Sequence, residues 1–391
     1  MPSIRYLPHM TIDDGANVPI WDDVGWAPLP VLRGEHAADV CVVGLGGSGL
    51  ACITELLRLG KRVIGIDARG VAAGAAGRNG GFLLAGLPAF HHEAIAAIGH
   101  ERARRLYALT VAEMDRMTAE TPDAIRREGS LRLAVSPEEE RDCAAHLDAL
   151  RADGFPAEAY RGAEGTGVLI PSDGTFHPVR RCRALAQRAL AAGASLFESS
   201  PVTDVATGSV AAPEGRVRCE HVVVAVDGRL ERILPGLTGR VRTARLQMLA
   251  TAPAREVHVP RPVYARWGYD YWQQLPDGSI ALGGCRDRAM EEEWTELATP
   301  TPGVQRLLER LLHERVGVRA PIVRRWAASV SFTPDRLPLL EEVAPAVIAL
   351  GGYSGTGNVL GAMCGRAAAC LTAGARPELL ELLRPAGATS H

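Results

Sequence analysis

Two stretches of this 391-residue chain, one near each end, combine an apolar run, a cluster of glycines and a further run with helical spacing. In the first, residues 38–70, the valines from Val40 onwards are typical of a buried parallel strand. A helix is expected from about Gly47 to Leu59, followed by a second strand that ends at Asp67. The second stretch, residues 347–374, predicts the same succession of strand, glycine loop and helix.

The residues between these stretches show other patterns. One or two long helices are expected over 91–127, a strand over 129–136 and a charged helix over 137–154. From 241 to 285 the pattern becomes strand-rich, with a hairpin turn at Pro276-Asp277-Gly278. Strand-turn-helix units at both ends around a strand-rich block predict an α/β nucleotide-binding domain that is interrupted by a second domain.

Charge and composition exclude several classes of function. The formal net charge of −2 gives no support for nucleic-acid binding. The eight cysteines form no C-x-x-C pair and no His cluster completes a metal pattern, so we expect no metal site and a reducing, cytoplasmic location. No apolar run approaches the ~20 residues of a membrane helix, and the first residues lack the apolar region of a secretory signal.

The first glycine cluster, residues 44–49, fits the G-x-G-x-x-G pattern. Gly44 would allow the tight turn, Gly46 would let a pyrophosphate approach the backbone, and Gly49 would let the helix pack on the strand. The helix N-terminus would then face the phosphates. Asp67 lies 23 residues after Gly44, where an acid can accept hydrogen bonds from ribose hydroxyls. The pattern predicts an adenine dinucleotide and leaves NAD and FAD both open.

The second glycine-rich segment, GAAGRNGGFLLAG at residues 74–86, distinguishes between these cofactors. It follows the first loop by about thirty residues, where a simple NAD-binding domain would continue to alternate strands and helices. A second backbone-rich cradle could lie along an extended FAD molecule, from the pyrophosphate to the isoalloxazine ring. Gly80 and Gly81 would let the backbone pass the ring face.

With these two loops, the chain resembles the D-amino-acid oxidase family of FAD enzymes, which includes glycine and sarcosine oxidases. It is most similar to the branch that carries GASGRNGG, which includes γ-glutamylputrescine oxidase-like enzymes. The resemblance spans roughly residues 35 to 372. Five further segments carry it: LIPSDGTFHPVRRCRALAQRALAAGA, VVVAVDGRLERILPGL, YWQQLPDGSIALGG, RWAASVSFTPDRLPLL and ALGGYSGTGNVLG.

The resemblance implies an α/β fold, with a Rossmann-like FAD-binding domain and an inserted α+β substrate domain on a mixed, largely antiparallel sheet. It also implies hydride transfer from a carbon next to nitrogen to flavin N5, hydrolysis of the imine, and reoxidation by oxygen to give peroxide. The expected division is an N-terminal arm (1–36), a discontinuous FAD-binding domain (37–90, 156–240 and 322–391) and a substrate domain (91–155 and 241–321).

The chain departs from the family pattern at the cofactor. Ala76 stands where Ser or Thr is usual near a phosphate, so one hydrogen bond of roughly 1 kcal/mol is lost. Ala328 takes the place of the cysteine that attaches flavin in covalent members, so non-covalent FAD is expected. Thr356 stands where many relatives have His, and the glycines around it still allow close approach to the flavin.

It also departs from the pattern at the substrate and oxygen sites. Val330 replaces the arginine that clamps a substrate carboxylate, which favours an amine over an α-amino acid unless Arg266 or Arg286 takes over this role. Ala281 lies near the position of the lysine that assists oxygen reduction, and Lys61, the only lysine, cannot serve there. Either another group handles oxygen or the acceptor is different.

Motifs and resemblance together give a set of expected site residues. The run YARWGYDYW places Trp267, Tyr269 and Tyr271 on one face of a strand, either as an aromatic wall of the substrate site or as ordinary packing. Arg78, Asn79, Tyr269 and Tyr271 are the expected catalytic residues, and the substrate site adds Trp267, Arg286 and Val330. The expected FAD-binding residues are Gly44, Gly46, Gly47, Ser48, Gly49, Asp67, Ala68, Arg69, Gly74, Ala75, Ala76, Arg78, Asn79, Gly80, Gly81, Val202, Asp227, Gly228, Gly352, Tyr353, Gly355, Thr356 and Gly357.

Three histidines are expected to be structural. His91 and His92 follow the second glycine loop closely, and we interpret them as helix-start residues at a surface or cleft edge, although a general-base role is conceivable. His177, before Pro178, is interpreted as a structural residue.

The sequence thus favours an FAD-dependent oxidase of amines that works on small molecules, with oxygen as acceptor and no nucleic-acid or membrane partner. An oxidase of α-amino acids or N-methyl amino acids is the first alternative. A flavin dehydrogenase with another acceptor, a flavin-binding scaffold without catalysis and an NAD-dependent dehydrogenase are the others. The sequence does not indicate an oligomeric state.

Overall fold

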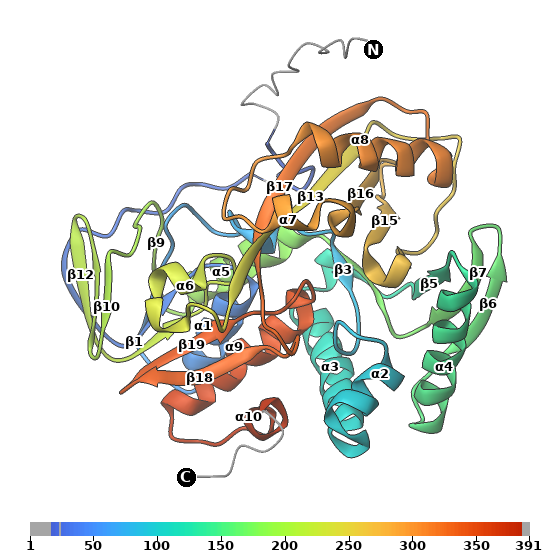
Figure 1. The fold of residues 1–391 in the computed structure, drawn as a ribbon. Coiled ribbons are helices and arrows are strands. Elements are labelled where there is room, and N and C mark those ends of the chain that lie inside the picture. Colours follow the sequence, from blue (N-terminus) through green and yellow to red (C-terminus); the bar gives the residue numbers. More distant parts are fainter. Residues whose placement is uncertain (1–16, 23–24, 385–391) are drawn as a thin grey trace, which may run out of the picture.

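The computed structural model describes residues 17–22 and 25–384 as a mixed α/β protein with two large sheets (Figure 1). The first sheet joins both ends of the chain. Its path is β10 (Asp204–Ala206), β11 (Ser209–Ala212), β12 (Gly215–Val224), β1 (Gly34–Val43), β2 (Val63–Ile66) and β9 (Ser195–Phe197), and β19 (Val347–Gly351) and β18 (Leu339–Ala344) branch from β12. The strands β9, β2, β1, β12 and β19 are parallel neighbours in that order.

The second sheet is largely antiparallel, as expected for the second domain. In order it contains β17 (Ile322–Phe332), β13 (Arg242–Thr251), β16 (Ile280–Gly284), β15 (Asp270–Gln274), β14 (Val263–Ala265), β5 (Ser130–Ala134), β7 (Gly165–Ile170) and β6 (Glu158–Gly162). Only the pair of β14 and β5 is parallel among these neighbours. A small third sheet holds β3 (Phe82–Leu83), β8 (Gly174–Phe176) and β4 (Ile125–Arg126).

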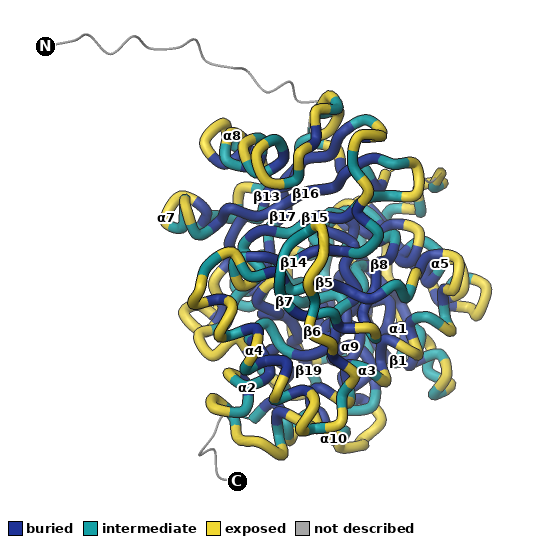
Figure 2. Tube along the Cα trace, turned by 90° about the vertical axis from the view of Figure 1, so that its right-hand side faces the viewer, coloured by how far each residue is buried: buried dark blue, intermediate teal, exposed yellow. Residues whose placement is uncertain are grey.

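Helices cover both large sheets, and buried residues concentrate along the strands and the central helices (Figure 2). On the first sheet, α1 (Gly47–Arg58) packs against α9 (Gly357–Thr372) and α5 (Pro178–Ala191), and α3 (His100–Glu120) packs against α9. On the second sheet, α8 (Pro302–Arg310) packs against β13 and β16. The other α-helices are α2 (His91–Ile98), α4 (Pro137–Ala152), α6 (Leu230–Ile233), α7 (Met290–Glu293) and α10 (Glu378–Leu383).

The expected elements agree closely with those observed. The first helix ends at Arg58, and Gly60 follows with φ +74°. The helical pattern over 91–127 divides into α2 and α3 because Gly99, with φ +87°, interrupts it. The predicted turn at Pro276-Asp277-Gly278 joins β15 to β16 as a hairpin, with Gly278 at φ +91°.

The boundaries between the two large sheets differ from the expected domain boundaries. Residues 158–170 and 322–332 were assigned to the FAD-binding domain, but they form β6, β7 and β17 of the second sheet. The reason is pairing between distant segments, since β17 is hydrogen-bonded to β13 along its length. The division into two domains remains a proposal, with these strands moved to the substrate domain.

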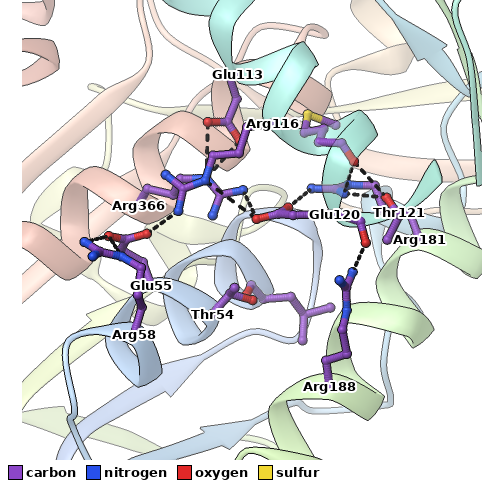
Figure 3. Close-up of polar contacts among 12 residues, drawn as sticks. Thr54, Glu55, Arg58, Glu113, Arg116, Glu120, Thr121, Arg181, Arg188 and Arg366 are labelled. Atoms are coloured by element: carbon purple, nitrogen blue, oxygen red, sulfur yellow. Dashed lines mark hydrogen bonds and ion pairs between the residues drawn. The ribbon is translucent and has the colours of Figure 1, made fainter.

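A buried ion network joins the helices that cover the first sheet (Figure 3). Arg366 of α9 bonds Glu113 at 2.9 Å and Glu120 at 2.7 Å, both on α3. Glu120 also accepts from Arg181 of α5, at 3.3 Å, and Glu55 of α1 pairs with an arginine of α3. Because each buried charge has a partner, the network fixes how the helices lie against one another, and removal of one partner is costly.

Close backbone contact between α1 and α9 also depends on glycine. A Cβ on Gly365 would lie 2.1 Å from the carbonyl oxygen of Ser48, so only glycine lets α9 approach the start of α1 this closely. In α8, by contrast, a Cβ on Gly303 would meet nothing within 4 Å.

These surroundings predict opposite effects for two glycine substitutions. Gly365→Ala should lower the free energy of unfolding by about 1–3 kcal/mol or more, because the added methyl group forces the two helices apart. Gly303→Ala, the matched control, should leave stability unchanged or raise it by roughly 0.5–1 kcal/mol through helix propensity. Urea denaturation measures both, and equal stability of the two variants would contradict the tight contact.

Candidate functional site

A cavity of about 1500 Å³ is lined by residues of both large sheets. It exceeds the roughly 300–1,000 Å³ of a pocket for a drug-sized ligand. All the site residues expected from the sequence line it except Gly49, Gly81 and Gly352. The structure therefore brings together both glycine loops, the C-terminal flavin-side segment and the aromatic run.

The first glycine loop has the geometry of a phosphate cradle. Gly44 has φ +106°, and a Cβ there would lie 2.6 Å from the carbonyl oxygen of Ala225. A Cβ on Gly49 would lie 1.9 Å from the carbonyl oxygen of Gly44, so Gly49 serves packing and does not line the cavity. No side chain caps the start of α1, and Gly46, Gly47 and Ser48 line the cavity there. Free N–H groups at a helix start favour anions.

Asp67 stands beside this cradle and holds its shape. Its carboxylate accepts hydrogen bonds from the backbone N–H groups of Leu45 at 2.9 Å, Arg69 at 2.8 Å and Gly70 at 3.0 Å. Burial raises the pKa of Asp67, against the effect of these hydrogen bonds. The carboxylate lines the cavity, where the ribose of a dinucleotide would lie next to the cradle.

The second glycine-rich segment lies directly against the first. A Cβ on Gly46 would be 3.2 Å from the Cβ of Ala76, so the two loops form one continuous wall. Asn79 holds the turn, since its Nδ2 donates to the carbonyl oxygen of Ala76 at 2.8 Å and its Oδ1 accepts from the N–H of Gly81 at 2.8 Å. The amide of Asn79 therefore supports the loop.

Packing within the protein gives a second reason for the two glycines at the end of this segment. A Cβ on Gly80 would lie 2.5 Å from the ring of Phe82, and one on Gly81 would lie 2.6 Å from the carbonyl oxygen of Phe176. Gly81 also has φ +70° and does not line the cavity. Contacts within the protein, not only a passing ligand ring, explain why glycine is required here.

Asp227 connects the two C-terminal segments at the cavity. Its carboxylate accepts hydrogen bonds from the N–H groups of Ser331 at 3.2 Å, Gly352 at 3.0 Å and Tyr353 at 3.4 Å. Burial raises the pKa of Asp227 to about 6. The neighbouring Gly228 lets β17 approach, since a Cβ there would be 2.3 Å from the carbonyl oxygen of Ser329.

An aromatic wall forms the side of the cavity that belongs to the second sheet. The rings of Tyr264 and Tyr271 stack at 5.7 Å, and both lie edge-on to Phe82. Burial raises the pKa of each tyrosine, so both hydroxyls are neutral at pH 7. Tyr264 belongs to the run noted in the sequence but was not among the expected site residues.

The expected strand face of Trp267, Tyr269 and Tyr271 is wrong. Residues Arg266–Gly268 form a 3₁₀ turn in which Trp267 has φ +53°, and β15 begins only at Asp270. Trp267 and Tyr269 still line the cavity, but from this turn and not from a strand. The Nε1–H of Trp267 donates to Asp142 at 2.8 Å.

The two arginines considered as carboxylate anchors differ in their partners. Arg266 is neutralised by Asp270 at 3.3 Å and Asp287 at 2.5 Å. Arg286 lines the cavity, is 7% exposed, and forms no ion pair within the described chain. Its Nε and Nη2 are buried without a hydrogen-bond partner, and burial lowers its pKa.

Aromatic rings hold the Arg286 guanidinium in place. Its carbon Cζ lies 4.2 Å from the ring centre of Trp294 and 4.5 Å from that of Phe332. Arg242 lies 4.2 Å from Trp294 as well, and it pairs with Phe332 across β13 and β17. Trp294, Phe332 and Arg242 were not expected from the sequence. The pairing of β13 with β17 brings Arg242 and Phe332 together, and Trp294 comes from the end of α7.

The structure places the three histidines noted in the sequence, and the expected position of one of them needs correction. His91 does not lie at a surface or cleft edge: it is 3% exposed, and its Nε2 lies 2.7 Å from Asp153 Oδ2 because α2 packs on α4. His92 is half-buried. His177 caps α5, with its side chain accepting from the N–H of Arg180, as expected for a structural residue.

In the described part of the chain, no group of three or more His, Cys, Asp or Glu side chains is arranged to hold a metal ion. None of the helices between residues 17 and 384 that the structure describes is long and apolar enough for a membrane span.

The polar groups along the cavity fit FAD. The helix start and the glycine cradle offer N–H donors to phosphates, and the Asp67 carboxylate can accept from ribose hydroxyls. The two glycine loops form a continuous wall that leads towards the second sheet.

Comparison with known proteins agrees with this fit. The family model described as DAO, FAD dependent oxidoreductase, matches residues 39–371. The chain is 27% identical to the probable oxidoreductase OrdL of Rhizobium meliloti, over 90% of this chain and 86% of that protein. It is 24% identical to gamma-glutamylputrescine oxidoreductase of Escherichia coli, over 89% and 87%.

Among solved structures, the fold is similar to that of glycine oxidase from Geobacillus kaustophilus, with a TM-score of 0.70, 22% identity, and coverage of 88% of this chain and 96% of that chain. The resemblance inferred from the glycine loops is thereby confirmed. Because the family model matches most of the chain, this protein belongs to the DAO family of FAD-dependent oxidoreductases.

Proposed function

We propose that this enzyme oxidises the C–N bond of a primary or secondary amine and passes the electrons to oxygen. One observation carries the proposal: the phosphate cradle and the aromatic wall of Tyr264 and Tyr271 line the same cavity. FAD, when bound, supplies N5 as the hydride acceptor. The relative named gamma-glutamylputrescine oxidoreductase supports an amine as donor.

The reaction balances without a protein base. The carbon next to nitrogen loses a hydride, the nitrogen loses a proton to solvent, and the resulting imine is hydrolysed to a carbonyl compound and an amine or ammonia. Oxygen takes up two electrons and two protons to give hydrogen peroxide. The role of the chain is to bind a neutral amine against Tyr271 and Tyr264, whose neutral hydroxyls and apolar rings exclude water.

Arg286 favours a second candidate, the oxidation of amines that carry a carboxylate, including α-amino acids. A buried guanidinium without a partner is costly unless a ligand supplies the anion. Arg286 meets this description on the cavity wall, whereas Val330 stands where relatives have an arginine. We propose that Arg286 anchors such a carboxylate, with Arg242 adding positive charge nearby.

An anaerobic spectral titration should separate the two candidates. Amines without a carboxylate should bleach the flavin if the first is right. If only carboxylate-bearing amines bleach it, the second is right, and Arg286→Met should then weaken their binding about tenfold or more, since hydrogen bonds to charged groups contribute about 1.5–3 kcal/mol. Arg324→Met, an exposed residue of β17, is the control. No bleaching by any amine would contradict both.

Air admitted to the reduced protein tests the acceptor. Rapid return of the yellow colour with formation of peroxide supports an oxidase. Slow return supports a dehydrogenase with another acceptor, for which the absence of lysine near Ala281 is an argument.

We infer that FAD is held without a covalent bond. Ala328 lines the cavity where a cysteine attaches flavin in covalent members. The cysteine that does line the described cavity, Cys182, has its thiol pKa raised to about 11 by burial, so it is a poor nucleophile. A cytoplasmic location remains a prediction from cysteine usage.

Acid precipitation of the purified protein tests this attachment. The flavin should stay in the supernatant with the absorbance and mass of free FAD. Yellow colour that remains with the washed precipitate would contradict non-covalent binding and direct attention to Cys182.

A further inference from the structure

A residue near the start of the described chain reaches the wall of the cofactor cavity. Asn17 accepts hydrogen bonds from Nη2 of Arg78 on both its carbonyl oxygen, at 2.7 Å, and its Oδ1. Its Oδ1 also accepts from the N–H of Ala327 at 3.1 Å, and its Nδ2 donates to the carbonyl oxygen of Ala298 at 2.7 Å. One side chain thus joins the second glycine loop, β17 and the loop before α8.

A second residue of the same arm supports the next position of the loop. Trp21 is 3% exposed and donates its Nε1–H to the carbonyl oxygen of Asn79 at 2.7 Å. Its ring lies edge-on to His177, with the ring centres 5.5 Å apart. Arg78 and Asn79 are therefore both held by residues of the N-terminal arm, which no sequence motif connects with the site.

The partners of Arg78 leave its charge intact. Its Nε donates to the carbonyl oxygen of Ala327 at 2.7 Å, and its other acceptors belong to Asn17, so every acceptor is neutral. Within the described residues, no carboxylate forms an ion pair with Arg78. The buried Arg245 and Arg366, by contrast, pair with Glu293 and Glu113.

Burial lowers the pKa of Arg78 to about 10, so the guanidinium is still protonated at pH 7. Arg78 lines the cavity, and a positive charge in a region of low dielectric stabilises negative charge placed nearby. Neutral acceptors such as those of Asn17 orient the guanidinium without cancelling this effect, whereas a carboxylate in their place would cancel most of it.

We propose that Asn17 is a positioning residue of the cofactor site, which fixes the Arg78 guanidinium on the cavity wall while leaving its charge unneutralised, so that bound FAD has a higher affinity for electrons. The inference rests on the FAD-binding cavity and not on the identity of the substrate. It assigns a function in the cofactor site to the N-terminal arm.

Sulfite titration of the oxidised holoenzyme tests the proposal without any substrate. Sulfite binds a flavin more tightly when the surroundings stabilise negative charge on it. Asn17→Asp has nearly the same shape but places a carboxylate against Arg78, and it should raise the dissociation constant of sulfite by about tenfold, equivalent to roughly 1.4 kcal/mol. The flavin midpoint potential should fall in parallel.

Two control variants separate charge from disturbance of the arm. Val18→Asp adds the same charge at the neighbouring position, where the side chain is 37% exposed, and should behave like the wild type. Asn17→Ala removes the amide donor to Ala298 and the Oδ1 acceptor of Arg78 without adding charge, while the backbone oxygen of residue 17 still accepts from Arg78. Its sulfite affinity should therefore lie between that of the wild type and that of Asn17→Asp. The proposal would be overturned if Asn17→Ala and Asn17→Asp lost sulfite affinity to the same extent. It would also be overturned if Asn17→Asp kept the sulfite affinity of the wild type.

Arg78→Gln tests the other residue of the Asn17–Arg78 pair. It remains informative if Asn17→Asp folds poorly. Removal of the guanidinium charge should weaken sulfite binding by a similar factor with Asn17 intact. Sulfite affinity equal to that of the wild type in Arg78→Gln would show that this charge does not act on the flavin and would overturn the proposal.

Discussion

The contact on which the rest of the structure depends is the close approach of backbone to backbone at the start of α1. Gly49 lies against the carbonyl oxygen of Gly44, and Gly365 of α9 lies against that of Ser48. These contacts fix the helix so that its free N–H groups face the cavity, and they bring the two strand-turn-helix units from the ends of the chain together. The phosphate cradle is therefore a consequence of packing that only glycine permits.

Among the described residues, most buried arginines are paired with carboxylates, but two arginines that line the cavity are not, and these add positive charge to the cavity. The buried arginines of the helix network and of β13 are matched by carboxylates such as Glu113, Glu120 and Glu293. Arg78 and Arg286 line the cavity and have no such partner in the described chain. Unneutralised positive charge at both places suits a cofactor that gains electrons and a substrate that carries an anion. Arg78 follows the 3₁₀ turn Ala75–Gly77, and Arg286 begins the 3₁₀ turn Arg286–Ala289 after β16, so the site depends on the packing of segments that are distant in the sequence.

The sequence was informative where the chemistry is local. The turn and helix of residues 44–59 and the hairpin at Pro276-Asp277-Gly278 could be predicted because neighbouring residues determine them. The wall around Arg286 could not, because Phe332 meets Arg242 only through the pairing of β17 with β13. The burial of His91 by α4 likewise depends on tertiary packing.

Two further differences arise where the sequence has no periodicity that would reveal them. Trp267 takes positive φ in a short turn, although the alternation of aromatic residues predicted a continuous strand. Asn17 lies in an irregular segment with no repeating pattern, so nothing in its neighbourhood indicated that it contacts Arg78, 61 positions later.

The central claim is that one FAD molecule spans the cavity from the cradle of α1 to the aromatic wall of the second sheet. A crystal structure of the purified holoenzyme tests it most directly. We expect the pyrophosphate at the N-terminus of α1, beside Gly46 and Gly47, and the isoalloxazine ring between the second glycine loop and Tyr271. Density for the pyrophosphate away from α1, or for the ring outside this cavity, would contradict it.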